Sequence, residues 1–145
     1  MGKKTITFVE TALVAAFIGV LVTGMMLHLR HEGIITTRMP MLKTIHYYLG
    51  FLMVSTAAIH GCVKAKYLKG LRVKYSLFVY DTYIVGALVL AVFVTGLAIL
   101  CAHAHAVAGW HYWLGVIMSL FVLYHLYIGL PFLLRTLFSK HTKSH

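Results

Sequence analysis

The stretch IHYYLGFLMVSTAAIHG occupies positions 45–61, and the related stretch WHYWLGVIMSLFVLYHL occupies positions 110–126. Histidine, tyrosine, leucine, glycine, methionine and a second histidine fall at matching places in the two stretches. Both stretches are apolar over about the length of a membrane-crossing helix, where a polar side chain is costly and usually functional. The chain therefore contains a repeated helix that twice places histidines in an apolar environment.

The segments just before these two stretches are also related to each other. Both contain Val-Thr-Gly, and in each a histidine, His31 or His103, lies seven residues after that glycine. The repeated unit is thus a pair of helices, with repeat 1 covering about 6–64 and repeat 2 about 76–135. A tandem-duplicated helix pair predicts a four-helix bundle of up-down-up-down order, with a pseudo-twofold axis along the membrane normal.

The composition indicates an integral membrane protein of the all-α class. Of the 145 residues, 61% are hydrophobic, the mean hydropathy is +0.87, and Asp and Glu together number three. Lys3 and Lys4 precede the first apolar run as they would in a signal peptide, but that run is too long for one, so we expect a retained helix. With nearly the whole chain used by apolar segments, we expect a single transmembrane domain over 1–145. The expected spans are about 6–28, 41–63, 76–102 and 108–134.

The basic residues predict the orientation in the membrane. Ten of the thirteen Lys and Arg residues would lie on the side of the two termini, and three on the other side. The positive-inside rule therefore places both termini in the cytoplasm. The net charge of +10 is explained by this topology and by attraction to anionic lipid headgroups, so we expect membrane lipid and no nucleic acid as a partner.

The two histidines of each repeated stretch lie fourteen residues apart, His46 with His60 and His111 with His125. Fourteen helical residues turn through about 1400°, some 40° short of four turns, and rise about 21 Å. Both imidazoles therefore leave nearly the same face of their helix, close to opposite leaflets. Because the two helices run in the same direction and sit diagonally, we expect His46 level with His111 near the outer leaflet. His60 is expected level with His125 near the inner leaflet.

Two facing imidazoles suit a haem iron, whose porphyrin supplies the four equatorial nitrogens. Small residues are needed where the flat macrocycle approaches a backbone, and Gly50 and Gly115 each lie one turn after a candidate ligand. Gly24 and Gly96 lie on the two flanking helices and are further candidate cofactor contacts. The haems are expected to be bound without covalent attachment, because the chain has no Cys-x-x-Cys-His motif. The alternatives are histidines that hydrogen-bond a neighbouring helix and glycines that serve helix packing.

The spacing of two histidines on both the second and the fourth helix resembles the N-terminal four-helix di-haem domain of the respiratory cytochrome b family. The chain is also similar to small bacterial four-helix membrane cytochromes that are catalogued as a domain of unknown function and often linked to flavin-carrying partners. The resemblance covers about 6–135 and implies electron transfer, a prokaryotic cytoplasmic membrane and two b-type haems. Because the later helices of respiratory cytochrome b are missing, it does not imply quinol oxidation with a Rieske partner. The resemblance also implies that the axial ligands of the two haems are His46, His60, His111 and His125.

Other polar residues gather near the expected outer face, with His31 and His103 at equivalent places of the two repeats. Imidazoles and soft thioethers together suit copper. A third haem, a quinone site with proton-shuttling histidines, and plain interfacial histidines are the other interpretations. The outer group consists of His28, His31, His103, His105, Met25, Met26, Met39 and Met41.

Charged residues near the expected haem edges have two interpretations each. Glu10 and Asp81 lie near the inner face. In one interpretation their negative charges stabilise the positive N-terminal ends of their helices, with or without pairing to nearby lysines. In the other they form a proton relay or a quinone site. The basic groups near the haem edges would neutralise propionates or only set the topology. These are Arg30, Arg38, Lys64 and Arg135.

The function expected from these features is transfer of electrons across the bilayer between a quinol or donor protein and a redox partner. A carrier is favoured over a stand-alone enzyme. The alternatives are a quinol or superoxide oxidoreductase that uses the outer haem, and a copper-handling membrane protein. Whether the chain acts alone or in a homo- or hetero-oligomer is left open by the sequence.

Overall fold

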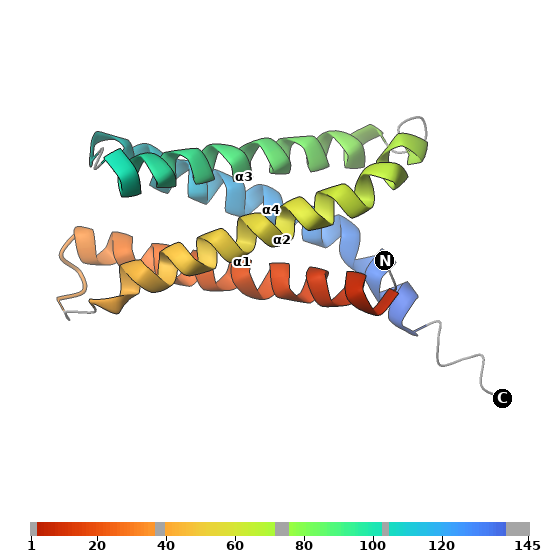
Figure 1. Cartoon of the computed structure of the whole chain (residues 1–145), viewed down its shortest axis with the longest axis horizontal. Helices are drawn as coiled ribbons and strands as arrows, with labels where there is room; N and C mark the ends of the chain where they lie inside the picture. The colour runs from red at the N-terminus through yellow and green to blue at the C-terminus, as the bar shows by residue number, and fades with distance from the viewer. Residues whose placement is uncertain (1–2, 37–39, 72–75, 103–104, 139–145) are drawn as a thin grey trace.

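The computed structural model describes residues 3–36, 40–71, 76–102 and 105–138. Within these residues successive helices run in opposite directions, and the beginning of α1 and the end of α4 lie at the same end of the molecule (Figure 1). The predicted all-α four-helix bundle of up-down-up-down order is confirmed. Its elements are α1 (Lys3–His31), α2 (Met41–Leu71), α3 (Ser76–Ala102), the short 3-10 turn η1 (His105–Val107) and α4 (Ala108–Phe138).

Helix α1 ends in a Schellman motif. Gly33 has a φ of 75°, in the left-handed region that glycine enters without steric cost. The Gly33 N–H donates to the Arg30 carbonyl at 3.1 Å, and the Ile34 N–H donates to the Leu29 carbonyl at 2.9 Å. These bonds satisfy carbonyls that the end of the helix would leave unpaired, and they stop α1 before the chain reaches α2.

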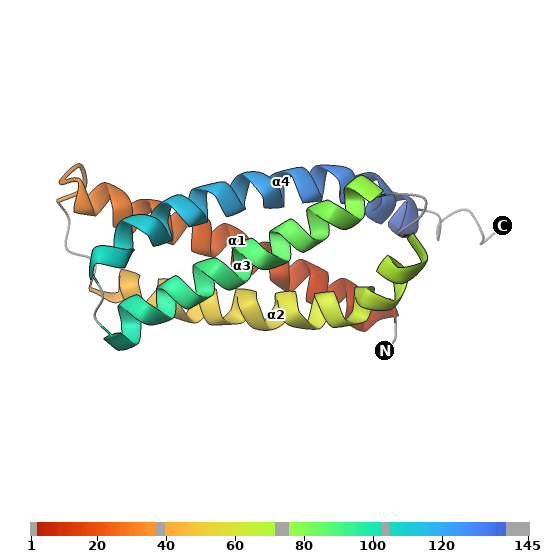
Figure 2. The ribbon, with the colours of Figure 1, turned by 90° about the horizontal axis from the view of Figure 1, so that it is seen from above.

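The four helices form two hairpins. Helix α1 packs mainly against α2 and α3 mainly against α4, while contacts between α2 and α3 and between α1 and α4 are sparser. Figure 2 shows α2 and α4 on opposite sides of the molecule, with α1 and α3 crossing between them. The two histidine-bearing helices therefore occupy diagonal positions, as the sequence predicts.

A small apolar core lies at mid-length of the bundle. Met53 and Met118 each lie seven residues from both histidines of their own helix, and they are only 4% and 2% exposed. The core thus separates one level of histidines from the other. It comprises Ala16, Phe17, Val20, Met53, Val92 and Met118, with all four helices contributing.

Each of the four helices is long and apolar enough to cross a membrane. The mean hydropathies of the candidate spans run from 1.2 to 2.8, and between 6% and 22% of each span is buried inside the molecule. Most of the apolar side chains therefore point outward, where water would penalise them and lipid would not. The candidate spans are Thr5–His31, Met41–Ala65, Val79–Ala102 and Ala108–Gly129.

Candidate functional site

Thr23 on α1 orients the ring of His46 on α2. The Thr23 hydroxyl oxygen lies 2.7 Å from the Gly19 carbonyl oxygen and 2.9 Å from His46 Nδ1. The hydroxyl has a single proton, which it donates to its own helix, so it accepts the hydrogen bond from His46 Nδ1–H. This tautomer leaves the lone pair of the imidazole on Nε2, which is a good metal ligand.

The second repeat contains the same arrangement. The Thr95 hydroxyl on α3 donates to the Ala91 carbonyl at 2.9 Å and lies 3.0 Å from Nδ1 of His111 on α4. The Val92 carbonyl lies 3.0 Å from the same hydroxyl. Because the Thr95 hydroxyl also has a single proton and donates it to its own helix, it accepts the hydrogen bond from His111 Nδ1–H.

The glycine that follows each of these threonines makes room for the imidazole. A Cβ atom built on Gly24 would lie 3.2 Å from His46 Cε1, and one built on Gly96 would lie 3.2 Å from His111 Cε1. Few real Cβ atoms approach another atom so closely, so a larger residue would push the ring aside. Each Val-Thr-Gly therefore acts as a cradle, in which threonine binds the ring and glycine lets it approach. In the structure these glycines lie against the histidine rings, and their expected contact with a haem stays a prediction.

The two cradled rings face each other across the bundle. The ring centroids of His46 and His111 are 6.3 Å apart, and the ring planes are nearly perpendicular, at 86°. The structure thus brings together the two histidines that the sequence predicts as the outer level pair. A Cβ atom on Gly50 or Gly115, one turn further along, would meet nothing within 4 Å, so both glycines border open space.

At the other level, His125 on α4 is held by a buried carboxylate from α3. Asp81 Oδ2 lies 2.7 Å from His125 Nδ1, and Asp81 is only 4% exposed. A carboxylate only accepts hydrogen bonds, so Nδ1–H donates and Nε2 is the nitrogen that a metal would bind. Within the described residues the second oxygen of Asp81, Oδ1, has no hydrogen-bond partner.

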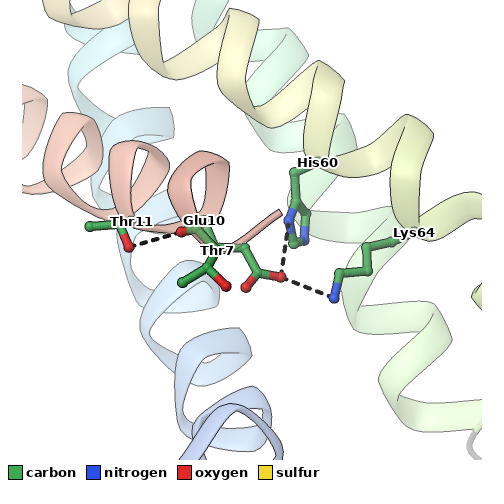
Figure 3. A network of polar contacts seen from close by, with 5 residues as sticks. All are labelled: Thr7, Glu10, Thr11, His60 and Lys64. Carbon is green, nitrogen blue, oxygen red and sulfur yellow. Dashed lines mark hydrogen bonds and ion pairs between the residues drawn. The ribbon is translucent and has the colours of Figure 1, made fainter. Parts of the chain in front are cut away.

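His60 on α2 also faces a carboxylate, but the contact is different. Glu10 Oε1 on α1 lies 3.9 Å from His60 Nδ1 and 3.0 Å from Lys64 Nζ (Figure 3). The first distance is beyond a hydrogen bond, whereas the second is a direct ion pair.

The placement of the two acids corrects one interpretation made from the sequence. Neither α1 nor α3 has an acidic residue in its first turn, so Glu10 and Asp81 do not serve the helix N-termini. They lie deeper, beside His60 and His125. The expected pairing of Glu10 with a nearby lysine is confirmed by Lys64.

The expected outer site is only partly described. His31 is the last residue of α1 and is exposed, and His103 lies outside the described residues. His28 instead stacks on Tyr112 of α4, with centroids 3.7 Å apart and planes at 16°. Met25 and Met41 are 55% and 74% exposed. Within the described residues no three His, Cys, Asp or Glu side chains gather closely enough to hold a metal ion.

The groups that orient the imidazoles are the functional residues that sequence reasoning missed. Thr23 and Thr95 were visible as part of the repeated Val-Thr-Gly, which served there only as a marker of the duplication. The sequence signal that could have identified them is that each threonine, like each histidine, occurs at the same place in both repeats. The partner of each threonine lies on the next helix, so no local spacing shows the contact.

Comparisons with known proteins add no relative to this description: no family model, no curated protein and no solved structure matches the chain. The resemblance to cytochrome b therefore stays a prediction, and a functional assignment rests on the residues and contacts described above.

Proposed function

We propose that the chain is a transmembrane b-type cytochrome that binds two haems and carries electrons across the bilayer. His46 and His111 would ligate the outer haem, and His60 and His125 the inner one. The observation that carries this proposal is the repeated cradle, which holds the rings of His46 and His111 with their centroids 6.3 Å apart between diagonal helices.

The spacing of the outer pair supports ligation of one iron from both sides. A metal-bound imidazole nitrogen lies about 2 Å from the metal, and its ring centre lies about 1 Å further away. Two imidazoles on opposite sides of one iron therefore have ring centres about 6 Å apart. The observed separation of 6.3 Å agrees with that value.

The inner site is built on the same plan. His125 receives its Nδ1 partner, Asp81, from the preceding helix of its own hairpin, as His46 and His111 receive theirs. Partners of this kind fix the tautomer and the ring orientation of metal-bound histidines. Asp81 is a buried polar group with one oxygen that has no hydrogen-bond partner among the described residues, which is unusual in an apolar bundle unless the group serves a function.

A six-coordinate iron has no open position, so the arrangement favours electron transfer over chemistry on a bound small molecule. The haem would supply a one-electron redox centre in each leaflet. The residues of this chain bind it, fix its axial ligands and exclude water with apolar helices. Gly50 and Gly115, which border open space, are expected to let the macrocycle approach α2 and α4.

The partners follow from this function. We propose a quinol or a donor protein as the source of electrons, and a redox partner, such as a flavin-carrying protein, as their acceptor. Lipid surrounds the apolar faces. The excess of Lys and Arg on the side of the termini supports a cytoplasmic position for both chain ends.

The experiment that tests the proposal is a reduced-minus-oxidised visible spectrum of the purified full chain, with haem quantified as the pyridine haemochrome. We expect two haems per chain and the spectrum of low-spin b-type haem. The variant with alanine at both His46 and His111 serves as the matched control and should retain one haem. A purified wild-type chain without haem, even when expressed with added haem precursor, contradicts the proposal.

A further inference from the structure

The four candidate axial histidines do not have equivalent Nδ1 partners. His46 and His111 donate to neutral threonine hydroxyls. His60 faces Glu10 at 3.9 Å, and the charge of Glu10 is balanced by Lys64 at 3.0 Å. His125 alone among the four has a hydrogen bond to a carboxylate within the described residues, at 2.7 Å.

Asp81 is buried, and among the described residues its only ion-pair partner is His125. The side chain is 4% exposed, and no lysine or arginine of the described residues forms an ion pair with it, unlike Glu10. A charge in such a poorly screened position acts strongly on its neighbours. Asp81 Oδ2 lies 2.7 Å from Nδ1 of a candidate haem ligand, His125.

From this asymmetry we infer that Asp81 is a positioning residue that lowers the reduction potential of the inner haem through His125, making it the lower of the two potentials. The inference rests on the proposed function. A carboxylate that accepts the Nδ1 proton raises the basicity of the ring. The more basic ligand and the nearby negative charge both stabilise ferric over ferrous iron. The threonine hydroxyls at the outer site carry no charge and have a weaker effect.

This order of potentials gives the molecule a preferred direction. With a haem held by His125 at the inner level and one held by His111 at the outer level, one electron would pass from the ferrous inner haem to the ferric outer haem, leaving the inner one ferric and the outer one ferrous. The step is downhill when the inner potential is the lower one. With the termini in the cytoplasm, electrons therefore pass from the cytoplasmic side to the outer side.

The test is a potentiometric titration of the purified full chain, wild type and Asp81→Asn, followed at the haem absorbance bands. Asparagine keeps the shape, and its side-chain oxygen still accepts from His125 Nδ1–H, so the ring remains oriented while the charge is removed. We expect the lower of the two potentials to rise by at least about 59 mV, which for one electron is a tenfold change in the equilibrium constant of reduction. The higher potential should change much less. His111→Ala, which keeps only the inner haem, assigns the lower potential to the inner site.

Glu10→Gln is the matched control, because it removes the other inner carboxylate, whose charge Lys64 already balances. We expect a clearly smaller shift than in Asp81→Asn. An equal shift in both variants would overturn the specific role of Asp81. Unchanged potentials in Asp81→Asn, or a shift confined to the outer haem, would overturn it as well.

A haem titration distinguishes failure of this inference about Asp81 from failure of the proposed function. Wild-type protein that binds no haem contradicts the proposed function, whereas two haems with unchanged potentials in Asp81→Asn contradict only this inference. If Asp81→Asn loses the inner haem, the Asp81→Glu variant, which retains the negative charge, is used to test the inference instead. Two haems with a wild-type lower potential in Asp81→Glu support the inference, and loss of the inner haem from that variant too overturns it.

Discussion

The Thr95 hydroxyl oxygen lies 3.0 Å from His111 Nδ1, and it reproduces the 2.9 Å contact between Thr23 and His46. The partners are 16 residues apart in one repeat and 23 in the other. The duplication has therefore kept the contact while the connection between the helices changed in length. A contact that is held constant while the linker varies is one that both halves of the molecule require.

Replacing these threonines by valine is expected to weaken the outer haem site. Thr23→Val or Thr95→Val keeps the side-chain volume but removes the hydroxyl that lies 2.9 Å or 3.0 Å from Nδ1, so the ring is held less firmly in its tautomer and orientation. Loss of such a partner typically costs about 10–100-fold in metal affinity. Haem titration of the apoprotein measures the effect, which should be confined to the outer site.

Thr56→Val is the matched control for both changes. Thr56 is also buried, and its hydroxyl donates to the Leu52 carbonyl of its own helix at 2.7 Å, but it lies on α2 with His46 and does not orient that ring from the neighbouring helix. Haem affinity should be unchanged in this variant. If Thr56→Val weakened haem binding as much as Thr23→Val, the cradle would have no special role.

The pairing of the ligands can be tested by single alanine variants. His46→Ala and His111→Ala should remove the same haem, because their rings face each other at one level of the bundle. His60→Ala and His125→Ala should both remove the other haem. Spectra and haem content of the four proteins check this, with the His46→Ala/His111→Ala double variant expected to lose no more haem than either single one. Loss of one and the same haem in His46→Ala and His60→Ala would refute the pairing.

The glycines of the cradle should tolerate no larger residue. In Gly24→Ala or Gly96→Ala the new Cβ approaches the imidazole to 3.2 Å, and overpacking of this kind costs about 1–3 kcal/mol. The outer haem should bind more weakly and its absorbance bands should shift, although alanine favours a helix over glycine. Gly129→Ala, whose Cβ meets nothing within 4 Å, should leave the outer site unchanged. An outer haem that binds normally in Gly24→Ala would show that the ring has room to move.

The orientation in the membrane predicts which ends of the helices a reagent can reach. In a chain without its native cysteines, Cys62 and Cys101, a cysteine at exposed Ile34 should react with a membrane-impermeant maleimide in intact cells. A cysteine at exposed Thr5, at the start of α1, should react only after the membrane is permeabilised. The reverse pattern would invert the topology, and with it the naming of the inner and outer haems.

The number and order of the helices could be predicted from the sequence, whereas their ends could not. Helix α2 was expected over about 41–63, but it extends over Met41–Leu71. Hydropathy reports where the apolar environment ends, and lysine, which follows at Lys64, Lys66 and Lys69, is a good helix former with a charge that lies comfortably in the interface. The helix therefore continues beyond the membrane boundary that the hydropathy detects.

The candidate ligands could be found from the sequence because their spacing repeats, but the groups that orient them could not. Whether Thr23 meets His46 depends on how α1 and α2 are rotated about their own axes, which only packing decides. Asp81 shows the same limit. Its position near the start of α3 suggested a helix-terminus charge, and only the structure places it against His125.

The division into hairpins also bears on how the molecule is put together. Each imidazole receives its partner from the other helix of the same hairpin, Thr23 with His46 in the first and Thr95 with His111 in the second, while contacts between the hairpins are sparse. A nascent chain that enters the bilayer one hairpin at a time would thus arrive with its ligands already aimed. Under the proposed function, the remaining step would be the docking of two preformed hairpins around the haems. Two copies of a single ancestral hairpin could have closed in the same way before the duplication joined them.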